Sequence, residues 1–181
     1  YDHWAEVTGD AAWRWDACLP CFKAHEDHWR GVDEMHAAPG FDARGQRPGG
    51  EWRVEKQRLR WDILDAFAAA AQQAGIPATS DFNRGNNEGV GYFEVNQRRG
   101  WRWNTTKAFL KPALGRPNLT VWTGAMVTRV LLERGAGGLR ASGVELRRVG
   151  HTVQALATRG VALCAGAVGT PQILQLSGVG P

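Results

Sequence analysis

The sequence predicts a mixed α/β fold, and three observations support this. Residues 59–74 have the periodicity of an amphipathic helix, with apolar residues at spacings of three and four before Gly75 and Pro77 end it. After Leu114–Pro117 the chain changes from a helix-rich part to short β-rich runs separated by glycines. The last run leads through a turn of small residues into a further helical segment. Both kinds of element are therefore expected, in two parts that meet near Leu114–Pro117.

The first part is expected to contain further elements. A helix is predicted over Asp16–Asp27, with its leading Asp as the cap and Pro20 in the first turn. Gly31–Gly50 is rich in Gly, Pro, Asp and Arg, a composition typical of a long loop. Tyr92–Gln97 partly alternates as a strand does, and Thr105–Thr106 is predicted to cap a short helix.

The second part is expected to form a strand, a β-meander and a buried strand, followed by a helix. The strands are predicted over Leu119–Trp122, Val127–Glu133, Leu139–Val149, Thr152–Thr158 and Gly160–Cys164. Thr170 is expected to cap a helix whose first residue is Pro171, where the missing N–H of proline is harmless. This helix is expected to occupy Gln172–Leu176 and to stop at Gly178.

Composition disfavours several classes of protein. The formal net charge is +4, but basic residues alternate with acidic ones, and the longest basic steps are pairs such as Arg98–Arg99 and Arg147–Arg148. A nucleic-acid surface needs a stripe of several cations, so we expect no nucleic-acid partner. No run approaches the roughly 20 apolar residues of a membrane span. Three cysteines cannot form a closed disulfide set, which favours a reducing, cytoplasmic location.

The motif formed by Cys18, Cys21, His25 and His28 suggests zinc, but its geometry argues against a metal site. On one straight helix the outer two residues lie about 15 Å apart, too far to converge on one ion. A thioredoxin-like redox pair would need a preceding strand, for which the sequence shows no pattern. His36, in the Gly/Pro-rich loop, is the histidine most expected to face a ligand. No residue is predicted to be a catalytic base.

The closing segment predicts a nucleotide-facing edge. A short apolar strand is followed by Ala165, Gly166 and Ala167, whose small side chains let a cofactor approach the main chain. The N-terminus of the following helix favours a negatively charged group. The same arrangement also occurs in folds that bind nothing, and the fingerprint G-x-G-x-x-G is absent from this sequence. Nine tryptophans fit either core packing or a carbohydrate-type surface.

The closing run Gly166–Gly180 (GAVGTPQILQLSGVG) resembles the second signature of the glucose–methanol–choline (GMC) oxidoreductases. It matches at the small residues, at Thr-Pro, at the aliphatic pair and at Ser-Gly-aliphatic-Gly. Further matches follow in order along nearly the whole chain: Leu19-Pro20, Phe22-Lys23, Asp81-Phe82-Asn83, Gly89-Val90-Gly91, Gly100, Arg102, Ala108-Phe109-Leu110, Pro112-Ala113, Arg116 to Leu119, and Val127 to Val130. The sequence as a whole is similar to the choline and alcohol dehydrogenase branch of this family.

The resemblance implies an FAD enzyme that oxidises a small-molecule alcohol to a carbonyl by hydride transfer to the flavin. It implies part of a Rossmann-like FAD-binding domain, formed by residues 1–45 and 116–181. Residues 46–115 would belong to a substrate domain built on an antiparallel sheet. The alcohol and the electron acceptor (oxygen, a quinone or another carrier) are not identified by the resemblance.

Positions in the family pattern imply roles for individual residues. Val127 matches the residue whose backbone meets the adenine of FAD, and Ala165 and Gly166 match the turn beside the adenosine. Val95 and Gln97 would lie on the substrate side of the sheet.

The sequence also departs from the family pattern. The amino-terminal dinucleotide fingerprint and the carboxy-terminal His pair are absent, so the chain is expected to be an inactive middle portion of a longer enzyme. Cys21 stands where an aromatic residue is more usual. Two alternatives remain open, an FAD-containing lyase of the same family and a non-enzymatic, Trp-rich carbohydrate-binding module.

Overall fold

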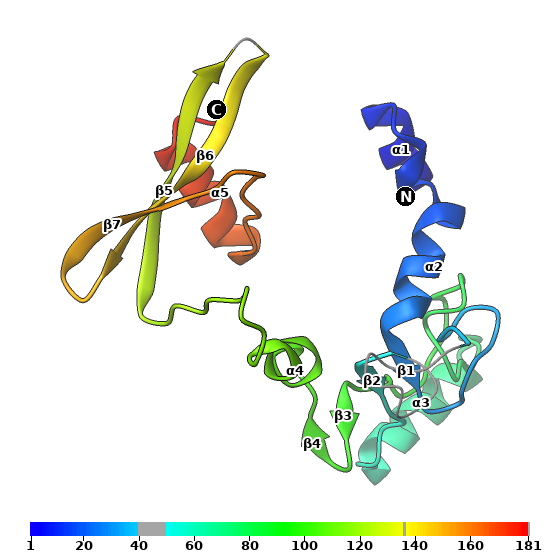
Figure 1. Cartoon of the computed structure of the whole chain (residues 1–181). Helices are drawn as coiled ribbons and strands as arrows, with labels where there is room; N and C mark the ends of the chain where they lie inside the picture. Colours follow the sequence, from blue (N-terminus) through cyan, green and yellow to red (C-terminus); the bar gives the residue numbers. More distant parts are fainter. Residues whose placement is uncertain (40–49, 136, 181) are drawn as a thin grey trace. The chain divides into compact units, whose positions relative to one another are not determined.

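The computed structural model describes residues 1–39, 50–135 and 137–180. The chain divides into two compact units, Tyr1–Leu119 (unit 1) and Thr120–Pro181 (unit 2). Figure 1 shows helices and strands in both units, which confirms the mixed α/β class. Half of the expected loop at residues 31–50 lies outside the described residues, and its described residues, 31–39 and 50, belong to no helix or strand.

Unit 1 begins with three short helices, α1 (Asp2–Thr8), η1 (Ala11–Trp13) and α2 (Trp15–His25). The expected helix is confirmed as α2, but Pro20 lies in its interior and not in its first turn. Pro20 is interior because α2 starts at Trp15, before the predicted cap at Asp16. At this earlier start the N–H of Trp15 donates to the carboxylate of Asp2 over 3.0 Å. Pro20 therefore removes one main-chain hydrogen bond from within the helix.

The periodic helix is confirmed as α3 (Asp62–Gln73), three residues shorter at its start than predicted. Trp61 is extended at the N-cap, and Gly75 follows the helix with a φ of 92°. The side chains of Ile63 and Phe67 are 69% and 67% exposed. The apolar face that produced the periodicity is therefore uncovered within the described part of the chain.

Short strands join the segments of unit 1. β1 (Glu26–His28) pairs in parallel with β2 (Trp52–Val54), and β3 (Gln97–Arg98) pairs antiparallel with β4 (Trp101–Arg102). The expected strand at residues 92–97 is only partly correct, because residues 92–94 are outside any strand and a single bridge joins Val95 to Glu55. The side chains of residues 92 and 94 instead bond to partners elsewhere in unit 1.

Unit 1 ends with η2 (Thr106–Leu110), a π-helical turn, and α4 (Lys111–Ala113). Thr105 occupies the N-cap position, as predicted, but its side chain makes no capping hydrogen bond. The side-chain oxygen of Asn104 instead accepts the N–H of Lys107 over 3.1 Å. Ala108, only 2% exposed, is one of the few apolar core residues of this unit.

Unit 2 is an antiparallel sheet with one helix. β5 (Ala125–Gly135), β6 (Gly138–Arg148) and β7 (His151–Leu156) lie in the order β5-β6-β7 and confirm the predicted meander (Figure 1). The strands at Leu119–Trp122 and Gly160–Cys164 were predicted wrongly. Among the described residues no strand pairs with either run, and an unpaired run cannot form the hydrogen bonds that define a strand.

The last helix, α5 (Gly166–Leu176), begins five residues before the predicted first position. Thr170 and Pro171 are therefore inside the helix, and the predicted cap is wrong. The Thr170 hydroxyl reaches back and accepts the N–H of Ala165 over 3.1 Å, so it supports the helix start from within. At the other end, Gly178 and Val179 donate to the carbonyls of residues 175 and 174, a Schellman motif that confirms the predicted stop.

α5 packs against β5 through Ser177. The Ser177 hydroxyl accepts the N–H of Val130 over 2.8 Å and donates to the carbonyl of Ile173 over 2.6 Å. Val130 and Leu146, 7% and 4% exposed, are the buried apolar residues of this unit among those described.

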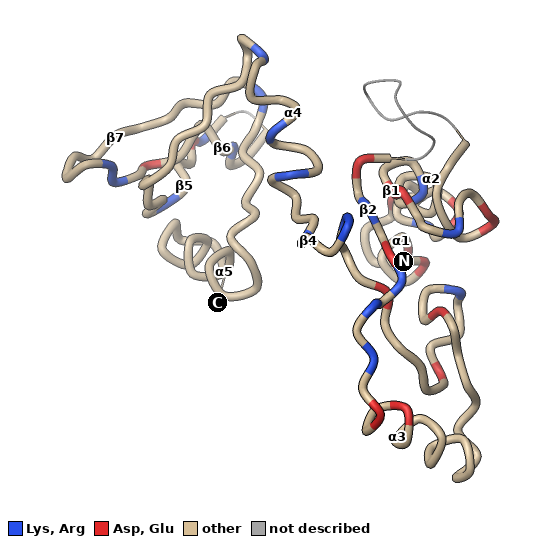
Figure 2. Tube along the Cα trace, turned by 90° about the horizontal axis from the view of Figure 1, so that it is seen from below, with Lys and Arg blue, Asp and Glu red and all other residues tan. Residues whose placement is uncertain are grey.

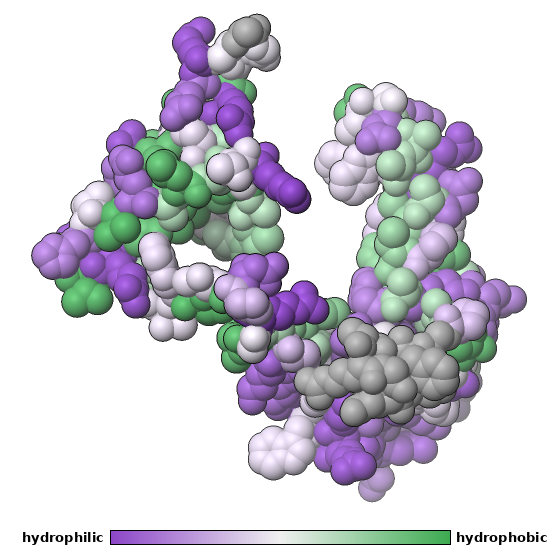
Figure 3. Space-filling view, viewed as in Figure 1, coloured by the Kyte–Doolittle hydropathy of each residue, from purple (hydrophilic) through white to green (hydrophobic). Residues whose placement is uncertain are grey.

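Charge and hydropathy are distributed over both units. Figure 2 shows Lys and Arg spread along the trace, with Asp and Glu beside them around β1 and β2. Figure 3 shows hydrophobic side chains that remain uncovered along α2 and over the sheet of unit 2. Of the helices in the described ranges, none has the length and apolar character needed to cross a membrane.

Candidate functional site

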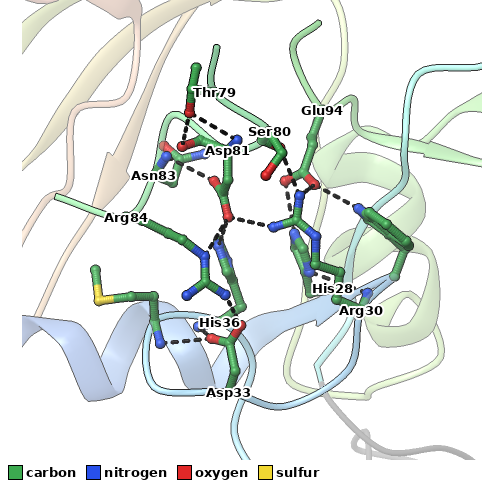
Figure 4. Close-up of polar contacts among 12 residues, drawn as sticks. His28, Arg30, Asp33, His36, Thr79, Ser80, Asp81, Asn83, Arg84 and Glu94 are labelled. Carbon is green, nitrogen blue, oxygen red and sulfur yellow. Dashed lines mark hydrogen bonds and ion pairs between the residues drawn. The ribbon is translucent and has the colours of Figure 1, made fainter. Parts of the chain in front are cut away.

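Eight charged or titratable side chains meet in unit 1, where segments distant in sequence come together, and Figure 4 labels all of them except Glu26. We call them the histidine cluster: Glu26, His28, Arg30, Asp33, His36, Asp81, Arg84 and Glu94. His28, His36 and Asp81 are only 3%, 3% and 4% exposed. Such burial of charged groups is tolerated only when each has partners of opposite charge.

His36 is held between two carboxylates. Its Nδ1 lies 3.1 Å from Glu26 Oε2, and its Nε2 lies 2.8 Å from Asp81 Oδ2. A ring nitrogen must carry a proton to bond to an ionised carboxylate, so both nitrogens are protonated and the ring is an imidazolium. Burial alone would lower the pKa of His36, but the bonds to Asp81 and Glu26 outweigh it and raise the pKa above 6.5.

His28 has a partner at each ring nitrogen. Its Nδ1 lies 3.3 Å from the main-chain nitrogen of Arg30, and its Nε2 lies 2.8 Å from Glu94 Oε2. The ring stacks on that of His36 with centroids 4.0 Å apart and planes at 14°.

Asp81 and Glu94 connect the cluster to two arginines. Arg30 donates to Asp81 over 2.7 Å and lies 3.0 Å from Glu94, and Arg84 donates to Asp81 over 3.2 Å. Burial would raise the pKa of Asp81, but the N–H of Asn83 and the bonds from His36 and Arg30 lower it to about 2. Asp81 is therefore ionised at neutral pH, with its buried charge compensated.

The cluster is built around internal partners. Both ring nitrogens of His36 are bonded to Glu26 and Asp81, and the expectation that His36 faces a ligand stays a prediction. Sequence reasoning missed the cluster as a whole. Its one local signal was Asp81, which accepts the main-chain N–H of Asn83 within the Asp-Phe-Asn turn.

The four residues of the Cys18, Cys21, His25 and His28 motif are divided between two elements. Cys18, Cys21 and His25 lie on α2, whereas His28 lies on β1 and is bonded to Glu94. Over the described ranges, no group of three His, Cys, Asp or Glu side chains is arranged to hold a metal ion.

The predicted substrate-side residues lie on the segment that the cluster anchors. Val95 exchanges two main-chain hydrogen bonds of 2.9 Å with Glu55, and Gln97 begins β3. Glu94, directly before Val95, accepts from His28 and, over 2.6 Å, from Trp29 Nε1. The cluster therefore fixes the main chain from which both predicted residues project.

The predicted cofactor residues all lie in unit 2. Val127 is in β5, beside an irregularity in its pairing with β6, and Ala165 and Gly166 are at the start of α5. Gly166 has a φ of 83°, and a Cβ placed there would meet nothing within 4 Å. The main chain at this point is therefore open to a large group.

These residues fit the adenosine part of FAD in their chemistry. The first turn of α5 has main-chain N–H groups without helical partners, and its dipole attracts negative charge. Gly166 and Gly169 add no side chain that would keep a ligand away. The roles of Val127, Ala165 and Gly166 remain predictions.

Comparisons with known proteins show the family of this chain. Residues 1–181 match the family model described as GMC oxidoreductase. Mitochondrial choline dehydrogenase of Homo sapiens is 36% identical over 180 residues, which are 99% of this chain and 28% of that protein. The chloroplastic fatty acid photodecarboxylase of Chlamydomonas reinhardtii is 42% identical over 149 residues, which are 77% of this chain and 24% of that protein.

A solved structure is also similar over the full chain. The crystal structure of pyridoxine 4-oxidase from Mesorbium loti matches with a TM-score of 0.82 and 33% identity, covering 100% of this chain and 33% of that one. The chain thus spans a third or less of the length of the relatives that it matches. Because the family match includes every residue from 1 to 181, this chain belongs to the GMC oxidoreductases.

Proposed function

We propose that this chain is part of an FAD-dependent oxidoreductase that oxidises the CH–OH group of a small alcohol to a carbonyl. The observation that carries the proposal is the similarity to choline dehydrogenase along 99% of the chain. In this reaction the carbinol carbon gives up a hydride and the hydroxyl gives up a proton. The FAD, when bound, supplies the acceptor for the hydride.

The residues of unit 2 are proposed to hold the adenosine end of FAD. The main chain of Val127 meets the adenine, and Ala165 and Gly166 form the turn beside it. The open space at Gly166, at the start of α5, supports this assignment.

The residues of unit 1 are proposed to form part of the substrate wall. Val95 and Gln97 face the substrate, and Glu94 holds their segment in place through its bonds to His28 and Trp29. The group that takes the hydroxyl proton is proposed to be the family histidine outside this sequence. Residues 1–45 and 116–181 are assigned to the FAD-binding domain and residues 46–115 to the substrate domain.

A cytoplasmic location is proposed on the basis of the cysteines. Cys18, Cys21 and Cys164 are free thiols, and Cys21 and Cys164 are exposed, which suits a reducing compartment. Fractionation of the source cells with an antibody against the protein tests this, and recovery in an organelle would contradict it.

Anaerobic spectroscopy of the whole protein tests the proposed oxidation. The purified protein is expected to contain FAD, and a primary alcohol such as choline or pyridoxine should bleach the flavin with formation of an aldehyde. A flavin that stays oxidised across a broad alcohol panel would refute the proposal. The isolated chain is expected to bind FAD poorly, because it lacks the G-x-G-x-x-G fingerprint.

A lyase is the second candidate, and the similarity to a fatty acid photodecarboxylase favours it. In that reaction a carboxylic acid would lose CO₂ and the remaining carbon chain would take a hydrogen. Product analysis separates the two activities. Release of CO₂ from a fatty acid under light, without oxidation of any alcohol, would support the lyase.

The carbohydrate-binding alternative has less support. The relatives described above carry enzyme names, and the family that matches is one of oxidoreductases. Saturable glycan binding by a whole protein that contains no flavin would favour this alternative.

A further inference from the structure

Two thiols lie one turn apart on α2, and the proposed reaction uses neither of them. Cys18 and Cys21 occupy positions i and i+3 of this helix, and both are free thiols. Residues three apart on a helix lie on the same side, with Cβ atoms about 5–6 Å apart. Cys21 is exposed and Cys18 is half-buried, so a reagent from solvent reaches the pair at Cys21 first.

The contacts of the two sulfurs leave them available for reaction. The Cys18 thiol donates to the carbonyl of Ala12 over 3.5 Å, and the Cys21 thiol donates to the carbonyl of Ala17 over 3.9 Å. Sulfur is a weak donor, so these bonds hold the thiols loosely. Because the Cys21 side chain reaches back to residue 17, its sulfur lies beside the turn that carries Cys18.

Pro20, between the two cysteines, weakens the helix at the place where a disulfide would form. A disulfide needs Cβ atoms about 3.5–4.5 Å apart, which is closer than a regular helix places them. The helix must therefore change locally for the bond to close. Proline has no N–H, so α2 lacks the main-chain bond that another residue at position 20 would donate. Strain in the closed bond also makes it easy to reduce.

The end of α2 is bonded to the loop of the histidine cluster. Lys23, two residues after Cys21, donates to the carbonyl of Asp33 over 2.6 Å and to that of Glu34 over 3.0 Å. The carboxylate of Asp33 in turn accepts the main-chain N–H of His36 over 2.7 Å. A change of helix geometry around Cys21 would therefore reach this loop through Lys23.

We propose that Cys18 and Cys21 form a reversible disulfide in the presence of a hydroperoxide, and that its closure loosens the hold of Lys23 on the loop at residues 33–36. The Cys21 sulfur attacks one oxygen of hydrogen peroxide, the O–O bond breaks, and the other oxygen leaves as water with the thiol proton. The Cys18 sulfur then attacks the resulting sulfenic acid, and a second water leaves as the S–S bond forms. Two molecules of glutathione reduce the bond and become one glutathione disulfide.

The proposed pair differs from a thioredoxin-like active site. α2 is preceded by η1 and an extended Arg14 rather than by a strand. The disulfide is therefore proposed as a modification of this chain and not as an oxidant of other proteins. It does not depend on the alcohol oxidation proposed above, because both thiols belong to this chain and react without flavin.

Mass spectrometry of the whole protein tests the proposal. The protein is treated with a few equivalents of hydrogen peroxide, alkylated with iodoacetamide and digested with trypsin. Cleavage after Arg14 and Lys23 gives one peptide, residues 15–23, that contains both cysteines. This peptide is expected to have lost two hydrogens and to carry no alkyl group. Treatment with glutathione before alkylation should restore both alkylation sites.

Substitutions identify the partners in the bond. Cys18→Ser should abolish the disulfide and leave Cys21 as a sulfenic acid, which dimedone traps. The matched control is Cys164→Ser, which removes an exposed thiol with no second cysteine near it in the sequence and should leave the yield of disulfide unchanged. Far-UV circular dichroism verifies that each variant is folded.

Pro20→Ala tests the part assigned to the proline. The variant regains the missing N–H, so closure of the disulfide should be about 2- to 10-fold slower, the factor that one main-chain hydrogen bond is worth. Hydrogen exchange tests the link to the loop. The N–H groups of residues 33–36 should exchange faster in the oxidised than in the reduced wild type, and peroxide should not change their exchange in Cys18→Ser.

Three results would overturn the proposal. The first is that both cysteines of the peptide remain alkylated after peroxide treatment. The second is that the peptide gains oxygen without closing, as in oxidation to a sulfinic acid. The third is that Pro20→Ala closes as fast as wild type and closure leaves exchange at residues 33–36 unchanged. Loss of alcohol oxidation alone would affect the proposed function and not this inference.

Discussion

Unit 2 is held together by main-chain hydrogen bonds along β5, β6 and β7, whereas the centre of unit 1 is held together by side chains distant in sequence. His28 bonds to Glu94 across 66 positions, and Arg30 bonds to Asp81 across 51. In the sheet the stabilisation is spread over many equivalent bonds. In unit 1 a few charged groups carry it, so single substitutions there should have larger effects.

The largest effect is expected from His36→Ala. This change removes the imidazolium between Glu26 and Asp81 and leaves two carboxylates without it, at a cost of about 3–5 kcal/mol of unfolding free energy. Urea denaturation measures the loss. The control is His151→Ala, at an exposed site on β7, with an expected change within about 0.5 kcal/mol. Equal effects at the two sites would contradict the comparison.

The contribution of His36 to the free energy of unfolding should decrease at alkaline pH. Its pKa is raised in the folded state, so its stabilisation is complete below 6.5 and is lost as pH rises through the folded pKa. The difference in unfolding free energy between wild type and His36→Gln should therefore shrink from pH 6 to pH 9. A difference that is constant over this range would show that folding does not raise the pKa of His36.

The contribution of Asp81 to the free energy of unfolding should decrease at acid pH. Its pKa is lowered from 3.8 to about 2, so its stabilisation is present above 3.8 and is lost as pH falls towards 2. The loss amounts to about 2 kcal/mol. Acid titration of the unfolding free energy should show a steep fall in wild type and a shallower one in Asp81→Asn.

Ser177→Ala tests the attachment of α5 to the sheet. It leaves the N–H of Val130 without its acceptor, and a buried unsatisfied donor costs about 1–3 kcal/mol. Thermal unfolding measures this loss. Ser142→Ala is the control, because its hydroxyl makes one long bond of 3.4 Å, and it should cost less. An equal loss of stability in Ser177→Ala and Ser142→Ala would show that the Ser177 hydroxyl does not attach α5 to the sheet.

The smallest effect is expected from Gly166→Ala. The added Cβ meets nothing within 4 Å, so the cost is backbone strain at a φ of 83°, about 1 kcal/mol. Gly160→Ala, where φ is ordinary and space is open, should be nearly neutral. If FAD lies here as proposed, Gly166→Ala should also weaken FAD binding by the whole protein.

The same difference between the units explains what could be predicted from sequence. α3 and the strands β5–β7 follow from periodicity and turns, which are local signals. The histidine cluster has no such pattern, because Glu94 meets His28 only after the intervening chain has folded. Val95 and Gln97 are assigned to the substrate side by the family pattern alone, and this role stays a prediction.

Errors in detail also have physical causes. Pro20 and Pro171 were placed in first turns by their usual preference, but contacts from Asp2 and Thr170 extended both helices backwards. The run Gly160–Cys164 has strand composition but no partner strand among the described residues.

The bond between Val130 and Ser177 has a further consequence. β5 is an edge strand of the sheet, and an edge strand with free N–H groups can recruit a strand from another molecule and start aggregation. The outward N–H of Val130 is instead bonded to the end of α5. The helix therefore shields the middle of this edge, so loss of the Ser177 hydroxyl should promote self-association as well as unfolding.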